Sequence, residues 1–280
     1  MIALAYSLEM PEGDTIHRAA RTIAKAIGGR VITRFETVVA ALARANDQQP
    51  IVGRRIDAVT ARGKNLIIAF SGGLFLRSHL RMNGSWHIYR PGEAWMKRRS
   101  DMRVVIATDD FVVVGFNLPI AEFHDARSLE REPDLQRLGP DLVADDFDPA
   151  EALRRIRRYP DREIADVLLN QGALAGIGNI YKSEVLFLCG ISPFALVSSV
   201  ADGELERVIA IARKLLVHNV ERAGGSRETM SSLRQSQRLW VYGRRGEPCR
   251  KCGTRIEYRR QGPDVRGTYW CPRCQTRHGA

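Results

Sequence analysis

The stretch from Cys249 to Cys274 reads CRKCGTRIEYRRQGPDVRGTYWCPRC. It contains two Cys-x2-Cys pairs separated by 18 residues. Each pair presents two thiolates, and four thiolates complete the tetrahedral coordination of a structural zinc ion without leaving a position for a substrate. We therefore predict one structural Zn2+ bound by Cys249, Cys252, Cys271 and Cys274.

The segment between the two pairs has the pattern of a β-hairpin. Residues 256–259 and 268–270 are strand-like, and Gln-Gly-Pro-Asp at 261–264 supplies a turn between them. Three arginines lie on this hairpin: Arg259, Arg260 and Arg266. They are either solvated surface charges or, held by a rigid metal clip, contacts to phosphate.

The positive charge of the chain is concentrated at the same end. The 280 residues carry a formal net charge of +11 and have a pI of about 9.8. Residues 227–280 hold 13 Lys and Arg against 4 acidic residues, which is +9 of that total. A polyanionic partner is indicated, with nucleic acid favoured over an anionic membrane surface.

Cysteine usage and hydropathy narrow the class of protein. Five cysteines in a chain of this length do not resemble a secreted disulfide framework. The fifth, Cys189, is expected to be a small buried hydrophobe. No apolar run approaches the ~20 residues that span a bilayer, and residues 1–9 lack the features of a signal peptide. We expect a cytoplasmic protein that does not enter membranes.

Hydrophobic periodicity changes along the chain. A helix is predicted after Asp14 or Thr15, which serve as alternative N-caps. Residues 30–123 follow with many short strand-like runs separated by turns, as in a sandwich or barrel. From 148 the pattern is helical, and residues 226–248 are expected to be a linker or loop. The predicted fold class is α+β and multidomain.

Two glycines precede one of the predicted helices. In Gln171–Tyr181, Gly176 and Gly178 stand just before a helix for which Asn179 is a possible N-cap. Such a start exposes backbone N–H groups to an anion. A tight turn between two helices is the alternative interpretation.

Near the beginning, Met10-Pro11-Glu12-Gly13-Asp14 has two interpretations. It is either a polar turn before the first helix, or a start from which Met10 is removed. The second would leave a secondary amine on Pro11 beside the Glu12 carboxylate. An α-amino group titrates near pKa ~7.7–8, so it can attack an aldehyde and form a Schiff base.

Two loops that follow strand-like runs contain candidate functional residues, Lys64 in the first and Met82 in the second. Lys64 lies in Arg62-Gly63-Lys64-Asn65 and is by default a solvated hairpin lysine. Met82 lies among polar neighbours in residues 79–84, HLRMNG. It is either a core filler or an apolar wedge inserted between bases.

Taken together and in this order, the motifs resemble the formamidopyrimidine-DNA glycosylase / endonuclease VIII family of base-excision repair enzymes. The resemblance runs from Met10 to about Gln275. Besides the motifs already described, it rests on Leu138-Gly139-Pro140-Asp141. Pro-Glu-Gly-Asp resembles the endonuclease VIII side, which favours oxidised pyrimidines. The expected domains are an N-terminal catalytic β-sandwich with a leading helix (10–142), a helix–two-turn–helix domain (143–245) and a zinc-bound β-hairpin (246–280).

The resemblance implies a role for each matching residue. Pro11 would be the nucleophile at the sugar C1′, Glu12 would handle protons, and Lys64 would contact phosphate and assist catalysis. β- and δ-elimination would then leave a one-nucleotide gap. The expected DNA contacts are His79, with Arg81 assisting, Met82 filling the hole left by the everted base, and Asn179 and Arg266 on phosphates. The partner would be damaged DNA, bound by a monomer associated with a bacterial nucleoid.

An amide nitrogen on Pro11 would be unreactive, so we expect Met10 to be the start of the working protein and residues 1–9 to be a non-native or removed extension. Removal by proteolysis and a catalytically silent relative are the alternatives. Two functions are therefore compared. One is a bifunctional glycosylase and abasic-site lyase, and the other is a non-catalytic, zinc-dependent protein that binds damaged DNA on the same scaffold.

Overall fold

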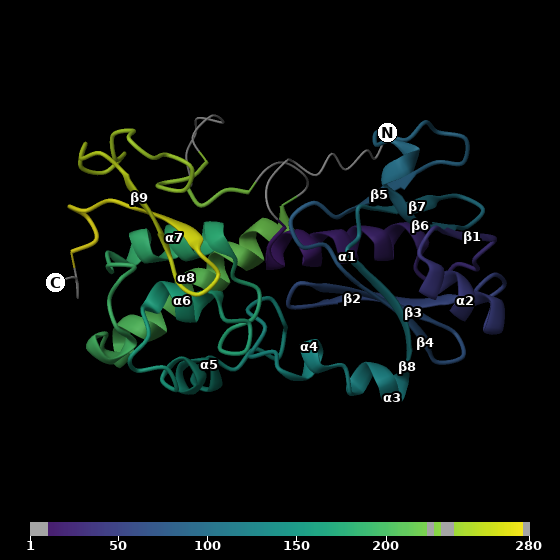
Figure 1. Ribbon diagram of the computed structural model, residues 1–280, viewed down its shortest axis with the longest axis horizontal. Helices are drawn as coiled ribbons and strands as arrows, with labels where there is room; N and C mark the ends of the chain where they lie inside the picture. The colour runs from purple at the N-terminus through teal and green to yellow at the C-terminus, as the bar shows by residue number, and fades with distance from the viewer. Residues whose placement is uncertain (1–10, 223–226, 231–237, 277–280) are drawn as a thin grey trace. The chain divides into compact units, whose positions relative to one another are not determined.

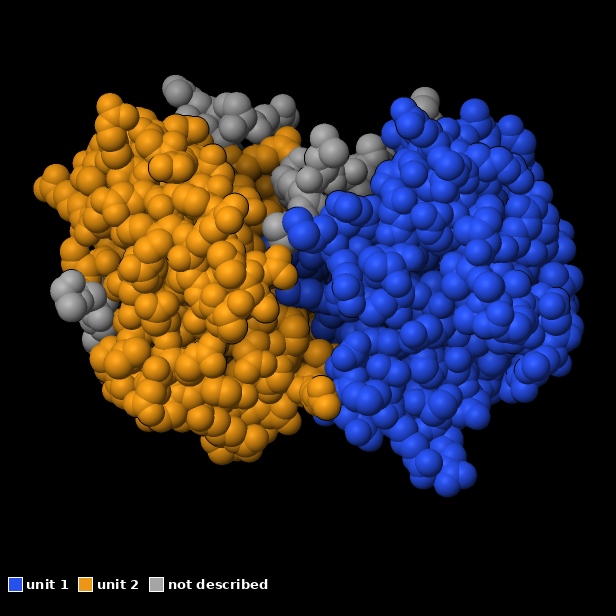
Figure 2. Space-filling model, viewed as in Figure 1, with its two compact units in different colours: residues 1–136, 222–226 blue, residues 137–221, 227–280 orange. Residues whose placement is uncertain are grey.

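The computed structural model describes residues 11–222, 227–230 and 238–276. The expectation about residues 1–9 and the removal of Met10 lies outside the described residues. The chain forms two compact units, which Figure 2 colours separately: residues 1–136 with 222–226, and residues 137–221 with 227–280. The zinc hairpin thus clusters with the helical segment in unit 2. The domain boundaries after residues 142 and 245 stay predictions.

Unit 1 begins with helix α1 (Gly13–Ile27). Its apolar residues repeat at helical spacing, so one face, including Ile16, Ile23 and Ile27, is fully buried. The N-cap is Glu12, in extended conformation, rather than Asp14 or Thr15. Both predicted caps are buried in the first turn instead, because the helix already begins at Gly13.

Two antiparallel sheets follow α1, as Figure 1 shows. The first has the strand order β2-β3-β4-β8, and the second has the order β1-β6-β7-β5. The strands are β1 (Arg34–Thr37), β2 (Ile56–Arg62), β3 (Asn65–Phe70), β4 (Leu74–His79), β5 (Ser85–Tyr89), β6 (Met102–Ala107), β7 (Val112–Phe116) and β8 (Ile120–Asp125). One hydrophobic cluster contains residues of α1 and of both sheets, among them Ile23, Ile68 and Val113. The predicted β-sandwich with a leading helix is confirmed.

One helix and one strand are among the elements of unit 1 that the sequence prediction missed. Helix α2 (Ala40–Gln48) buries only Leu42, so it has little of the apolar periodicity by which a helix is found. Strand β8 has mostly partly exposed or exposed residues, and its IAEFHD sequence lacks a β-branched run. Short helices complete the unit: η1 (Arg99–Asp101), α3 (Ala126–Glu130) and α4 (Pro133–Gln136).

A buried arginine joins the first sheet to the segment that follows it. Arg77 on β4 is only 2% exposed. Its guanidinium lies 3.0 Å from Glu122, 3.3 Å from Glu132 and 2.8 Å from Asp134, and its Nε donates to Asn65 Oδ1 at 3.1 Å. The carboxylates therefore already have their cation, and Arg77 fixes β3, β4 and β8 to one another.

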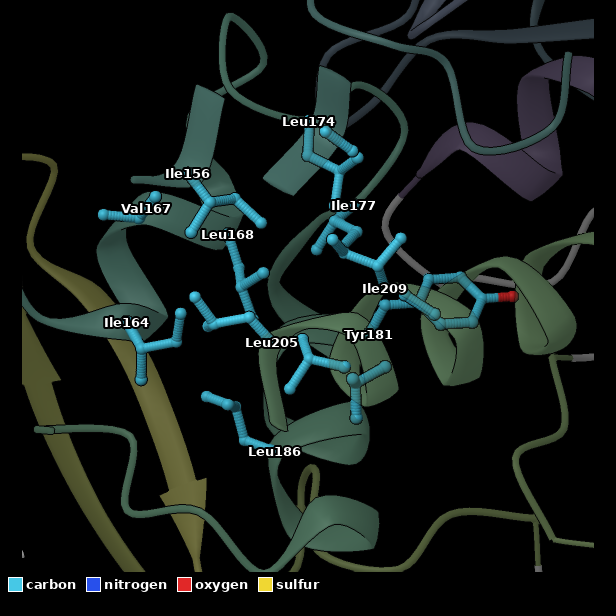
Figure 3. Packing of buried hydrophobic residues seen from close by; sticks show 14 of the residues in the cluster. Ile156, Ile164, Val167, Leu168, Leu174, Ile177, Tyr181, Leu186, Leu205 and Ile209 are labelled. Atoms are coloured by element: carbon cyan, nitrogen blue, oxygen red, sulfur yellow. The ribbon is translucent and has the colours of Figure 1, made fainter. Parts of the chain in front are cut away.

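Unit 2 is built from four main helices: α5 (Pro149–Ile156), α6 (Ile164–Leu169), α7 (Asn179–Cys189) and α8 (Asp202–Glu221). Asp148 caps α5 through Ala150 and Glu151, with Pro at the first position, as its sequence predicts. Figure 3 shows Leu168, Tyr181 and Leu205 among the side chains that meet between the helices. Cys189 is buried as expected.

The expected linker at residues 226–248 is in its described parts a packed segment. Arg227 is 1% exposed and Val241 is fully buried. Glu184 on α7 explains this packing, because its carboxylate accepts hydrogen bonds from the backbone N–H groups of Trp240 (2.8 Å), Val241 (2.9 Å) and Tyr242 (2.9 Å), and from the Thr229 hydroxyl. Burial raises the pKa of Glu184, and these hydrogen bonds oppose the rise.

The remaining elements are η2 (Val197–Ser199) and the hairpin strands β9 (Glu257–Gln261) and β10 (Arg266–Trp270). The two strands pair antiparallel, Gln261 with Arg266. The predicted zinc-module hairpin is confirmed, and each strand extends two residues further toward the turn than the sequence pattern indicates. No helix in the described residues is long and apolar enough to cross a membrane.

Replacing Arg77 with Met should lower the free energy of unfolding by about 1–2 kcal/mol. The loss is smaller than for a fully buried ion pair because Glu122 and Asp134 are about half exposed and regain water. Urea denaturation measures it. Arg55→Met is the control, because its pair with Asp57 is exposed and its loss should change stability by less than about 0.5 kcal/mol. Equal effects of the two variants would contradict this account of Arg77.

Candidate nucleic-acid site and metal centre

Lys64 and His79 lie at the same end of the β2-β3-β4-β8 sheet. Arg62 pairs with Asn65 across the tight turn that contains Lys64, and Asn65 pairs with His79 on the next strand. The Lys64 charge is also among the causes of the pKa shift of His79. The sheet register therefore brings together two residues that are 15 positions apart in the sequence.

The turn that carries Lys64 is held from both sides. Gly63 has φ of 58°, a left-handed conformation that glycine adopts without strain. Asn65 Nδ2 donates to the Arg62 carbonyl at 3.3 Å, and Asn65 Oδ1 accepts from Arg77. The sequence prediction missed Arg77 and Asn65 as supports, because a lone charged residue in a strand does not reveal its partners.

His79 is a neutral hydrogen-bond donor at neutral pH. Burial, followed by the nearby charges of Lys64, Arg77 and Arg81, lowers its pKa to about 4. The backbone N–H of Arg81 lies 3.1 Å from Nδ1 and donates to it. Because Nδ1 is the acceptor, the single proton of the neutral ring is on Nε2. This arrangement can donate to a phosphate oxygen without carrying a charge.

Met82 projects from the loop that follows His79. It is 59% exposed, so it is not the core filler that was one of its two interpretations. It lines a hollow of about 580 Å³ with the following residues: Arg81, Asn83, Arg103, Asn117, Leu118 and Pro119. Arg81 and Asn117 both have positive φ, 45° and 48°. The loop from Asn117 to Pro119 was missed in the sequence, although an Asn before Leu-Pro at a strand end is a turn signal.

Pro11 and Glu12 precede α1 in the same unit. Pro11 is half-buried and Glu12 is fully buried at the helix N-terminus. Figure 1 draws the start of α1 and the turn between β2 and β3 at the same end of unit 1. The positive end of the helix dipole favours a carboxylate at this position.

In unit 2, the start of α7 has the features of an anion site. The N-cap is Gly178, which offers no side chain to cap the helix, and Asn179 is the first helical residue rather than the N-cap. Asn179 is 8% exposed, and its side-chain Oδ1 is buried without a hydrogen-bond partner. Oδ1 only accepts hydrogen bonds, so an anion contact of Asn179 would use the Nδ2 end of the same amide.

The four predicted zinc ligands converge. Cys249, Cys252, Cys271 and Cys274 offer sulfur atoms that all lie within 4.8 Å of one another. Cys249 Sγ is 3.9 Å from Cys274 Sγ, and Cys252 Sγ is 3.4 Å from Cys271 Sγ. Ligands at about 2.3 Å from a tetrahedral zinc ion would be about 3.8 Å apart. Four soft donors with this spacing fit zinc.

Arg266 is the first residue of β10 and is exposed. Behind it, the strand is attached to α7, because the Lys182 ammonium donates to the Gly267 carbonyl at 3.1 Å and lies 2.7 Å from the Thr268 hydroxyl. The structure thus connects the element that carries Arg266 with the helix that begins at Asn179. Spacing in the sequence gives no sign of this link.

Replacing Cys249 with Ser should abolish stoichiometric zinc binding, unfold the hairpin and weaken DNA binding, because a structural zinc site loses one of its four ligands. Zinc per chain by atomic absorption and DNA affinity by fluorescence anisotropy measure this. Cys189→Ala is the matched control, because Cys189 is buried outside the cluster. Full zinc retention in Cys249→Ser would refute the assignment.

Acidification should destabilise unit 1 between about pH 6.5 and pH 4. The pKa values of His79 and His87 are each lowered to about 4, mainly by burial. In that window the unfolded chain therefore binds more protons than the folded chain, so stability falls as the pH falls. Urea midpoints at pH 7.5 and 5.0 measure the loss. His79→Gln should reduce it, whereas His218→Gln, on the exposed face of α8, should not; an unchanged loss in His79→Gln would contradict the prediction.

Comparisons with known proteins agree with this geometry. The Formamidopyrimidine-DNA glycosylase N-terminal domain matches residues 10–131, and the Formamidopyrimidine-DNA glycosylase H2TH domain matches residues 138–231. A zinc finger found in FPG and IleRS matches residues 246–277. The last match covers the four clustered cysteines, so the chain has one structural zinc site.

Whole-chain relatives extend the match. Probable endonuclease 8 2 of Streptomyces coelicolor is 42% identical over 95% of this chain and 94% of its own. The DNA-(apurinic or apyrimidinic site) lyase Nei2 of Mycolicibacterium smegmatis is 38% identical over 95% and 99%. The Lactococcus lactis Fpg in complex with DNA containing an abasic site is 25% identical, with a TM-score of 0.80 over 95% of this chain and 99% of that one. This chain therefore belongs to the formamidopyrimidine-DNA glycosylase family, among relatives named endonuclease 8.

Proposed function

We propose that the protein is a bifunctional DNA glycosylase and abasic-site lyase that removes oxidised bases, pyrimidines by preference. The observation that carries the proposal is that Lys64 and His79 lie at one end of a sheet, next to the loop that exposes Met82. Pro11 and Glu12 precede the first helix of the same unit. Relatives named as abasic-site lyases and endonucleases over nearly the whole chain support it.

The proposed nucleophile is the amine of Pro11 once it is the N-terminal residue. Its lone pair attacks the sugar C1′, the bond from C1′ to the damaged base breaks, and the base leaves with a proton. The sugar ring opens, and the nitrogen and C1′ form an iminium ion. The iminium acidifies the neighbouring C2′ proton, so the 3′ phosphate and then the 5′ phosphate are eliminated.

The proposed proton carrier is Glu12. A carboxylate next to the nucleophile in sequence can donate to the ring oxygen as the sugar opens and accept a proton afterwards. Its burial at the start of α1 keeps competing water away. Lys64, on its fixed turn, contacts the phosphate beside the lesion and stabilises the negative charge there.

The proposed role of Met82 follows from base flipping. C1′ cannot be attacked while the nucleotide is stacked in the duplex, so the nucleotide is turned out and a void remains. An exposed apolar side chain on a short loop can fill that void. His79 contributes a neutral Nε2–H donor and Arg81 a cation beside it, and both bind the flanking phosphates.

Unit 2 supplies the other proposed phosphate contacts. The N-terminus of α7 presents backbone N–H groups and the Asn179 amide. Arg266 adds a guanidinium that can bind a phosphate with two hydrogen bonds. The zinc ion, held by its four cysteines, keeps the hairpin folded and takes no part in the reaction. We propose further that the protein acts as a monomer on nucleoid DNA in the cytoplasm.

Trapping with borohydride tests the reaction, because it reduces the iminium to a stable amine. Protein that begins at Pro11 should form a covalent adduct with DNA containing an abasic site. Pro11→Gly should lower the trapping rate by about tenfold or more, because a primary amine forms a neutral imine that must first be protonated. Denaturing gel electrophoresis measures the adduct.

The control is the full 280-residue chain with residues 1–10 retained, in which the Pro11 nitrogen is an amide. It should bind the same DNA but form no adduct at Pro11. If the protein that begins at Pro11 binds damaged DNA and yields no adduct, the alternative function holds, namely a non-catalytic binding protein on the same scaffold.

A further inference from the structure

Lys182 is the one lysine in the described residues that is completely shielded from solvent, at 0% exposure. An ammonium group is expensive to bury unless it is hydrogen-bonded. Its Nζ donates to the Gly267 carbonyl at 3.1 Å and lies 2.7 Å from Thr268 Oγ1, and Thr268 is itself fully buried. A buried lysine cannot contact DNA, so the proposed reaction gives it no role.

The position of Lys182 lies between the two proposed phosphate contacts of unit 2. It follows Asn179 by three residues on α7, which is less than one helical turn or about 4.5 Å along the axis. Its two partners on β10 directly follow Arg266. Lys182 is therefore three positions from Asn179 on α7, and its partners Gly267 and Thr268 are one and two positions from Arg266 on β10.

We propose that Lys182 is a positioning residue that sets the position of Arg266 relative to Asn179, so that both bind one stretch of DNA backbone. The inference rests on the proposed function of these two residues as phosphate contacts. The two phosphate contacts strengthen binding together only when the distance between them matches the spacing of phosphates along the DNA backbone. Hydrogen bonds from Lys182 fix the direction of β10, which apolar packing alone does not do.

Other contacts hold the partner strand β9 and the far end of β10, where the Trp270 ring packs edge-on against Phe194 at 4.8 Å between ring centroids. Gln261 Nε2 donates to Glu163 Oε2 at 2.9 Å, and the Arg259 guanidinium stacks over the Phe194 ring at 3.8 Å. Those contacts fix the hairpin to the residues around α6. Lys182 connects α7 by hydrogen bonds to the two residues of β10 that follow Arg266, so its loss should displace Arg266 without detaching the hairpin.

The test compares Lys182→Met with Lys251→Met in the full chain. Lys251 is exposed on the first zinc knuckle, so both variants remove one lysine charge from unit 2. The probe is a fluorescent duplex with a tetrahydrofuran abasic analogue, titrated at several salt concentrations. Lys182→Met should bind about tenfold more weakly, and the slope of log affinity against log salt should fall by about 0.9, the value for one lost phosphate contact. Lys251→Met should change affinity less than about twofold.

A double-mutant cycle shows whether Lys182 acts through Arg266. If it does, Lys182→Met combined with Arg266→Ala should bind within about twofold of Arg266→Ala alone. Losses that multiply would overturn the proposal. An Arg266→Ala variant that binds as tightly as the unchanged protein would instead contradict the proposed function of Arg266, so the two failures are distinguishable.

Thr268→Val is a second test of the proposal, for the case in which Lys182→Met weakens binding only because it fails to fold. Thr268→Val keeps the shape and charge of the site and removes the hydrogen bond from Lys182 to the Thr268 hydroxyl. With zinc content and thermal midpoint unchanged, it should weaken binding about threefold and have no further effect on Arg266→Ala. If it keeps full affinity while Arg266→Ala loses affinity, Lys182 does not position Arg266.

Discussion

Buried charge is the constraint on which unit 2 depends. Ten of the eleven residues of α7 are buried, including Lys182 and Glu184. Inside the protein each of these groups needs hydrogen-bonding partners that water would otherwise supply. Lys182 finds them on β10, and Glu184 finds them on the backbone of residues 240–242. Helix α7 therefore fixes both the segment at residues 240–242, which precedes the zinc module, and strand β10 of the zinc-module hairpin.

Unit 1 also has a buried charge that needs partners, in the β2-β3-β4-β8 sheet. Arg77 is buried between strands, and its guanidinium draws together Asn65, Glu122 and the acidic residues after β8. Through Asn65 it supports the turn that presents Lys64, and its charge helps to keep His79 neutral. Each unit thus has a buried cation, Arg77 or Lys182, that would not contact DNA itself. Each cation holds in place the elements that carry the proposed DNA-binding residues.

The sequence predicted most elements of the fold and missed those with weak patterns. Periodicity predicted α1, the sandwich strands through β7 and α8, because one face of each is consistently apolar. It missed α2 and β8, whose faces are mostly exposed. The expected linker at 226–248 is packed in its described parts because Glu184 accepts hydrogen bonds from its backbone. A hydropathy pattern cannot predict such a hydrogen-bonded pairing. The roles of Pro11, Glu12 and Lys64 stay predictions.

The sequence by itself determined the zinc module, most of the strongly periodic helices and strands, and the family, because metal spacing, periodicity and ordered motifs are local properties of the chain. Only the tertiary structure decided that Lys64 and His79 are neighbours, that Met82 is exposed beside a hollow and that Lys182 joins α7 to β10. Those relations depend on strand register and on the partners of buried charges. Both are settled by contacts between residues far apart in the chain, so neither can be derived from local sequence.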